Sequence, residues 1–89
     1  MALLDLLGRR WALRIGWELR EGATLTFREL QARCDGASSS VINDRLRELR
    51  DAAIIERRSE GYCLTPRGKE LLEMLLPLDR WAKNWARRS

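Results

Sequence analysis

The chain has 89 residues, 17 basic and 13 acidic side chains, a net charge of +4 and no histidine. This length predicts one domain with a small core, and 45% hydrophobic residues is too many for a disordered chain. Without histidine the chain lacks the commonest general base and the commonest metal ligand, so we expect no enzyme, no metal site and no other cofactor.

The N-terminal residues and the two cysteines narrow the class further. The apolar start is interrupted by Asp5 and has no basic segment before it, so it is not typical of a signal peptide. No run approaches the ~20 apolar residues that span a membrane, and we expect a cytoplasmic protein. Cys34 and Cys63 are too few and too far apart for a zinc pattern. A disulfide between them, or oxidation sensing by either thiol, remains open.

Arginine dominates the basic residues, with fifteen Arg against two Lys. The planar guanidinium suits phosphates and guanine edges, which favours a nucleic-acid partner. A GC-rich genome would raise the arginine content equally well, so composition alone does not decide.

The first part of the chain predicts two helices. Leucines in the range 3–7 fit one short helix, and Gly8 follows where a left-handed helix end is expected. A second helix is predicted from about Arg9 to Arg20. Its buried face has a spacing of four residues and consists of Trp11, Ile15 and Leu19.

A third helix follows a segment, Leu25 to Phe27, that could form a single edge strand. Thr26 and Glu29 have the spacing of a capping box, so the helix should begin directly after Thr26. Its inward residues are expected to be Leu30 and Ala32, and a turn at residues 34–36 should end it.

A fourth helix is predicted from about Ser39 to Ala53, with Ser38, Ser39 and Ser40 as candidate N-caps. One narrow stripe is apolar and must face the core: Ile42, Leu46, Leu49 and Ala53. The opposite face is polar: Ser40, Asn43, Asp44, Arg47 and Asp51. Two helices joined by a short glycine-containing turn, the second with a polar face, have the layout of a helix-turn-helix.

The last third predicts a hairpin and a helix. Strands at about 54–58 and 62–65 are joined by a turn at residues 59–61. Thr65 and Pro66 form a good helix start, and Pro77 should kink or split the helix that follows. A hairpin directly after a helix-turn-helix is a wing. We therefore expect a mostly α, α/β winged helix with a small β-hairpin, filling residues 1–89 as one domain.

Four strings resemble a known family: residues 6–11 (LLGRRW), 27–30 (FREL), 44–49 (DRLREL) and 64–68 (LTPRG). Together with Trp81 and the order of elements, they are similar to the HxlR-type winged-helix regulators, relatives of the MarR type. The resemblance implies a prokaryotic, homodimeric transcriptional regulator. The sequence differs by beginning too late for the Cys-Pro that the family usually carries, which argues against a redox switch like the family's. The wing is also shorter, which argues against deep wing contacts.

We expect the fourth helix to lie in the major groove of double-stranded DNA and the wing, about 54–65, to contact the backbone or minor groove. Asparagine can pair with adenine and arginine with guanine. Asp44 repels phosphate, and Arg45 lies near the edge of the core face. The candidate contacts are Ser38, Ser39, Ser40, Asn43, Asp44, Arg45, Arg47, Arg57 and Arg58. The alternative is an ordinary solvated helix face and a charged turn.

A second partner is expected to be another copy of the chain. A domain of this size can hardly bury two tryptophans at its C-terminus, and tryptophan is enriched at interfaces. The candidate interface residues are Leu3, Leu4, Leu7, Leu78, Trp81 and Trp85. Alternatively, these side chains fold back on their own chain. The other function considered is a winged-helix protein-interaction module that never binds DNA. The sequence does not reveal an operator or an effector.

Overall fold

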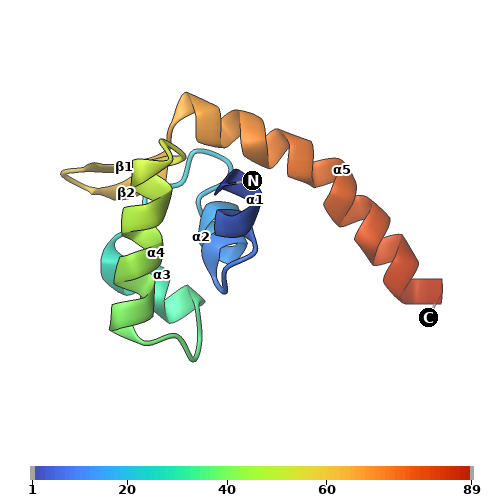
Figure 1. Ribbon diagram of the computed structural model, residues 1–89, viewed down its shortest axis with the longest axis horizontal. Coiled ribbons are helices and arrows are strands. Elements are labelled where there is room, and N and C mark those ends of the chain that lie inside the picture. Colours follow the sequence, from blue (N-terminus) through green and yellow to red (C-terminus); the bar gives the residue numbers. More distant parts are fainter. Residues whose placement is uncertain (1, 89) are drawn as a thin grey trace.

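The computed structural model describes residues 2–88, which form five helices and one antiparallel hairpin (Figure 1). This confirms a mostly helical winged helix. The elements, in chain order, are α1 (Ala2–Leu7), α2 (Ala12–Glu18), α3 (Phe27–Arg33), α4 (Ser39–Asp51), β1 (Ile55–Arg58), β2 (Gly61–Leu64) and α5 (Pro66–Arg88).

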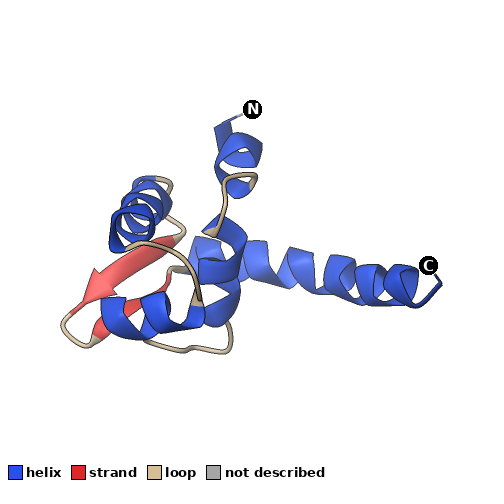
Figure 2. Cartoon of the chain, turned by 90° about the horizontal axis from the view of Figure 1, so that it is seen from below, coloured by secondary structure: helices blue, strands red, loops and turns tan. Residues whose placement is uncertain are grey.

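Two elements stand out from the body. Helices α2, α3 and α4 pack together with the hairpin, whereas α5 begins beside the hairpin and extends away from it (Figure 1). Figure 2 shows α1 standing out from another side of the body. The resulting molecule measures 43 × 29 × 27 Å. Both ends of the chain therefore carry helical surface that the body leaves uncovered.

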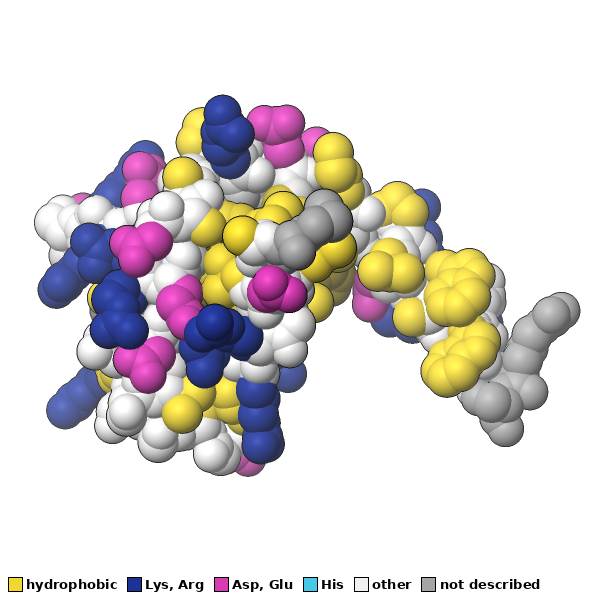
Figure 3. Space-filling view, viewed as in Figure 1, with side chains coloured by type: hydrophobic (Ala, Val, Ile, Leu, Met, Phe, Trp, Pro, Cys, Tyr) yellow, Lys and Arg dark blue, Asp and Glu magenta, His cyan; other side chains and the backbone are white. Residues whose placement is uncertain are grey.

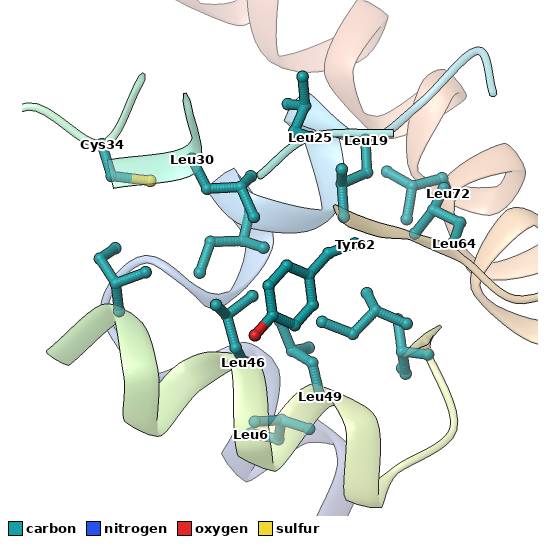
Figure 4. Packing of buried hydrophobic residues seen from close by; sticks show 14 residues of the cluster. Leu6, Leu19, Leu25, Leu30, Cys34, Leu46, Leu49, Tyr62, Leu64 and Leu72 are labelled. Carbon is teal, nitrogen blue, oxygen red and sulfur yellow. The ribbon is translucent and has the colours of Figure 1, made fainter. Parts of the chain in front are cut away.

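The core is one cluster of apolar side chains from every element. Helix α4 contributes the stripe Ile42, Leu46 and Leu49, none more than 1% exposed, which confirms the period of the predicted core face. Figure 4 shows Leu46 and Leu49 pointing toward the ring of Tyr62 from β2. Because this stripe is fully buried, the rotation of α4 about its axis is determined, and its polar face must point outward.

The N-caps of α3 and α4 form where the sequence predicts them. The Glu29 backbone N–H donates to Thr26 Oγ1 at 3.2 Å, and the Thr26 N–H donates to Glu29 Oε1 at 2.9 Å. These bonds lower the pKa of Glu29. Of the three candidate serines, Ser38 is the N-cap of α4, and its hydroxyl accepts from the Val41 N–H at 3.2 Å.

The hairpin is widened by one residue of a third strand. β1 and β2 pair with Ile55 opposite Leu64 and Arg58 opposite Gly61. Leu25 forms a bridge to Tyr62, donating to its carbonyl at 3.0 Å and accepting from its N–H at 2.7 Å. The edge strand considered for Leu25 to Phe27 is thus a single residue, because α3 begins two residues later.

Several predicted details were wrong. Helix α2 begins at Ala12 rather than Arg9, because Trp11 takes a left-handed conformation with φ of 77°. Helix α4 ends at Asp51, since Ala53, expected in the core stripe, has φ of 61° and is exposed. Ala32 is exposed as well, because Leu30 and Cys34 take the inward positions of α3.

Pro77 does not split the last helix. It lies inside the continuous helix α5, which curves gently in Figure 1. Pro77 is exposed, so no neighbouring element packs against its ring and slight curvature can relieve the clash with the preceding turn.

Candidate nucleic-acid interface

The exposed face of α4 carries most of the residues predicted to bind DNA. Ser38, Ser39, Ser40, Asn43 and Arg47 are exposed, and Asp44 is half-buried. Acidic and basic side chains are interspersed over the body on this side of the molecule (Figure 3). The face is therefore polar and hydrogen-bonding rather than uniformly positive, which suits reading base edges more than binding any polyanion.

Arg47 forms an exposed ion pair with Asp44 that another acceptor can replace. Its Nη2 lies 3.3 Å from Asp44 Oδ1, and the two side chains are 63% and 46% exposed. Ion pairs this exposed contribute little stability, because water competes for both charges. A DNA base or phosphate can therefore replace Asp44 at small cost.

A hollow of about 580 Å³ lies between the C-terminal half of α4 and β1. Its lining contains three arginines and two acids, together with Ile55: Arg47, Arg50, Asp51, Glu56 and Arg57. Arg50 was missed by the sequence reasoning. Its signal was available, because it follows Asn43 by seven residues and Arg47 by three, which places all three on one flank of the helix. The hollow thus joins the helix face to the wing through basic side chains.

The two wing arginines differ in their surroundings. The Arg57 guanidinium lies over the Tyr62 ring, 5.8 Å from its centroid. Arg58 donates to Glu56 Oε1 from Nη2 at 2.6 Å and from Nε at 3.1 Å, and this hydrogen bonding raises the pKa of Arg58. Arg57 is thus the wing arginine without a carboxylate bonded to it among the described contacts, and Arg58 is partly neutralised.

Arg45 is turned away from solvent. Its side chain is 17% exposed and forms an ion pair with Glu48, while its Nε donates to the Arg10 carbonyl at 3.1 Å. Its guanidinium is committed to the loop between α1 and α2. It therefore lies apart from the exposed residues with which the sequence grouped it.

The candidate interface residues are mostly exposed apolar side chains. Leu3, Leu4, Leu78, Trp81 and Trp85 are 44–62% exposed, whereas Leu7 is half-buried. The Trp81 and Trp85 rings stack at 6.4 Å and 11°. Figure 3 shows hydrophobic side chains gathered along α5. Two exposed residues were missed and extend this surface: Leu13, which lines a hollow together with Leu78, and Met74, one turn before Leu78 on α5. Leu76 is exposed as well, but it lies on the opposite side of α5 and borders a separate hollow with Trp17 and Leu72.

Both cysteines are buried and free, so the disulfide left open by the sequence does not form. Burial raises the pKa of the Cys34 thiol. The Cys63 Sγ lies 3.7 Å from Glu56 Oε1. A buried thiol with a raised pKa is a poor nucleophile, which does not favour oxidation sensing at Cys34.

Residues 2–88 bring together no group of three or more carboxylate, thiol or imidazole side chains that could hold a metal. None of the helices in the same range is long and apolar enough to cross a membrane.

Comparison with known proteins decides the family. Residues 6–89 match the family model described as HxlR-like helix-turn-helix. The chain belongs to this family. Members of the HxlR-like family are transcriptional regulators and not enzymes, and membership implies DNA binding. The resemblance seen in the four sequence strings is thereby confirmed.

Relatives within the family match over nearly the whole chain. The HTH-type transcriptional regulator YvaP of Bacillus subtilis is 32% identical over 92% of this chain and 82% of its own. A possible HxlR family transcriptional factor from Thermoplasma volcanium superposes with a TM-score of 0.84 at 29% identity, over 96% of this chain and 82% of that one. Quinone-bound YodB from B. subtilis gives a TM-score of 0.83 at 30% identity, over 92% of each chain.

Proposed function

We propose that this HxlR-like protein is a homodimeric, sequence-specific regulator that places α4 in the major groove of DNA and the wing on the backbone or in the minor groove. The observation that carries the proposal is the exposed flank of Asn43 and Arg47, which continues into the hollow beside β1 that three arginines and two acids line. A helix-turn-helix presents its second helix to base edges in this manner. Relatives in Bacillus and Thermoplasma support a prokaryotic protein, and we expect it to act in the cytoplasm.

The contacts divide by chemistry. Asn43 and Arg47 carry side chains that pair with two base atoms at once, and they would read sequence. Ser38, Ser39 and Ser40 surround the N-terminus of α4, where hydroxyl groups and backbone amides favour phosphate. Arg50 and Arg57 border the hollow and would hold the backbone, with weaker help from Arg58. Asp44 would release Arg47 when DNA binds.

Single substitutions test this division. Asn43→Ala or Arg47→Ala should cost roughly 1–3 kcal/mol on the preferred duplex and relax the preference at particular bases. Arg57→Ala should weaken all duplexes alike and reduce the slope of affinity against salt by about one unit. Lys83→Ala is the matched control, since it removes one positive charge from α5. Equal effects of Arg47→Ala and Arg57→Ala on every sequence would contradict the division.

The dimer would form through the exposed apolar surface of α5 and α1. Leu78, Trp81 and Trp85 recur at three and four residues on one side of α5, and Leu3 and Leu4 lie on α1. A two-fold interface buries such a stripe against its own copy. Trp81→Ala with Trp85→Ala should shift the protein toward monomer in sedimentation and weaken operator binding, because linked half-site contacts become separate events. Lys83→Ala, on the same helix, should remain dimeric.

The alternative is a winged helix that binds a protein instead of DNA. It predicts a purified dimer that prefers no duplex over another and has no steep dependence on salt. The exposed face of α4 lacks large apolar side chains that would anchor a protein partner, which favours DNA.

A further inference from the structure

Glu48 lies on the flank of α4 that faces away from the wing, and two arginines hold its carboxylate. Arg45 reaches it from one turn earlier on α4, and Arg9 reaches it from the loop after α1. The Glu48 and Arg45 side chains are only 22% and 17% exposed. Arg45 also donates from Nε to the Arg10 carbonyl at 3.1 Å. We call Arg9, Arg45 and Glu48 the clasp, because together they fasten α4 to the loop at residues 8–11.

The loop that the clasp contacts contains a non-glycine residue with a positive φ angle. Trp11 takes φ of 77°, a left-handed conformation that non-glycine residues adopt only where surrounding contacts hold it. The Arg10 guanidinium lies over the Trp11 ring at 5.2 Å from its centroid. Arg45 holds the Arg10 carbonyl, and the Trp11 side chain packs against the core cluster, so the loop can serve as a rigid anchor for α4.

The position of the clasp connects the two functional surfaces. The loop directly follows α1, whose Leu3 and Leu4 belong to the proposed dimer interface. Helix α4 carries Asn43 and Arg47, the proposed base-reading residues. The core stripe and β1 hold α4 on its other sides. The clasp thus joins the segment that would form the dimer to the helix that would enter the groove.

We propose that Glu48, held by Arg9 and Arg45, is a positioning residue that sets the orientation of α4 relative to the dimer-forming segment and thereby the half-site spacing that the dimer accepts. The inference rests on the proposed function. Glu48 itself points to the loop and contacts no DNA in this account. A two-fold protein reads two half-sites at a separation determined by the distance between its recognition helices, so loosening one fastening point broadens that separation.

Loss of the Glu48 charge and loss of its positioning contact should change DNA affinity in opposite directions, so the two effects can be separated. A carboxylate on a DNA-facing helix repels phosphate, so its removal alone would strengthen binding to every duplex. Loss of a positioning contact instead weakens the preferred operator relative to a scrambled duplex. If the ion pair only stabilised the fold, its loss would lower the melting temperature. The preference for the operator over a scrambled duplex and the preferred half-site spacing would then stay unchanged.

The experiment measures two quantities for the full chain. The first is the ratio of the Kd for a scrambled duplex to the Kd for the selected operator. The second is the change in the operator Kd when its half-sites are moved by one base pair. The variants are Glu48→Gln, Arg9→Gln, both together, and Arg45→Lys, which keeps the charge but replaces the separate Nε and Nη donors of the guanidinium with one ammonium group. Glu70→Gln on α5 is the control for loss of one acid. Circular dichroism gives the folded concentration of each variant, and every Kd is expressed against it.

We expect Glu48→Gln to lower the ratio roughly 3- to 30-fold and to flatten the spacing dependence, with Glu70→Gln like wild type. The Arg9 and Glu48 substitutions should be non-additive, because they remove the same contact. The Kd ratio and spacing dependence of Arg45→Lys should lie between those of wild type and Glu48→Gln. If Glu48→Gln does not fold, the values for Arg45→Lys test the inference in its place. Wild-type ratio and spacing in these variants would overturn the inference. A wild-type protein without preference for any duplex would overturn the proposed function instead.

Discussion

Gly68 is the position where a single methyl group should be least tolerated. It lies in the first turn of α5, and its N–H donates to Thr65 Oγ1 at 3.0 Å. A Cβ built on Gly68 would lie 2.0 Å from the Ile54 carbonyl oxygen and 3.0 Å from Leu64 Cδ2. The Ile54 carbonyl is backbone that also accepts from the Thr65 N–H at 3.0 Å, so it cannot move without disturbing the root of the wing.

Gly16 provides the matched comparison. It is buried inside α2, and a Cβ there would meet only Leu72 Cδ2, at 3.5 Å, which is an ordinary contact. Alanine is favoured over glycine in a helix by about 0.8–1.0 kcal/mol, so Gly16→Ala should stabilise the protein. At Gly68 the same gain is outweighed by a clash of about 1 Å, and forced overpacking typically costs about 1–3 kcal/mol or more. We expect a net loss near 2–3 kcal/mol.

Thermal unfolding at one fixed protein concentration measures both changes, since the proposed dimer formation would make the melting temperature depend on concentration. In a domain of this size about 1 kcal/mol corresponds to roughly 4–8 °C, so Gly68→Ala should melt roughly 10–20 °C below wild type and Gly16→Ala a few degrees above it. Melting temperatures of Gly68→Ala within two or three degrees of wild type would refute the reasoning about this close approach.

Two further predictions follow from the titrating groups. The capping-box bonds hold the folded pKa of Glu29 below its ordinary value near 4.5, so their stabilisation is present above that pH and is lost as the pH falls through the lower folded pKa. The difference in melting temperature between wild type and Glu29→Ala should therefore be constant near neutral pH and shrink in acid; a difference that grows in acid would contradict the assignment. Cys34 is fully buried, and burial raises the pKa of its thiol, so iodoacetamide at pH 8 should leave Cys34 unlabelled in the native protein and label it in urea, as read by peptide mass spectrometry. Rapid native labelling at Cys34 would show that the site opens.

Local chemistry made much of the fold predictable. The period of Ile42, Leu46 and Leu49 located the buried side of α4, and the capping box of Thr26 and Glu29 located the start of α3. These signals are short-range, since each depends on residues within one or two turns of helix. The exposure of Asn43 and Arg47 followed directly, because the opposite side of α4 had to be buried.

The parts that were not predictable depend on contacts between distant residues. Arg45 was grouped with the DNA contacts by its place on α4, but its partner, the Arg10 carbonyl, comes from 35 residues earlier in the chain. The left-handed Trp11 is similar, since only packing around the loop can hold a tryptophan there. The hollow that reveals Arg50 exists only after β1 packs beside α4.

Selection of random duplexes by the purified wild-type protein tests the central claim most directly. The account predicts an enriched palindrome with half-sites about 10 base pairs apart, or a multiple of that distance, and an affinity that falls steeply with salt. A folded, dimeric protein that enriches no motif at moderate salt would contradict it.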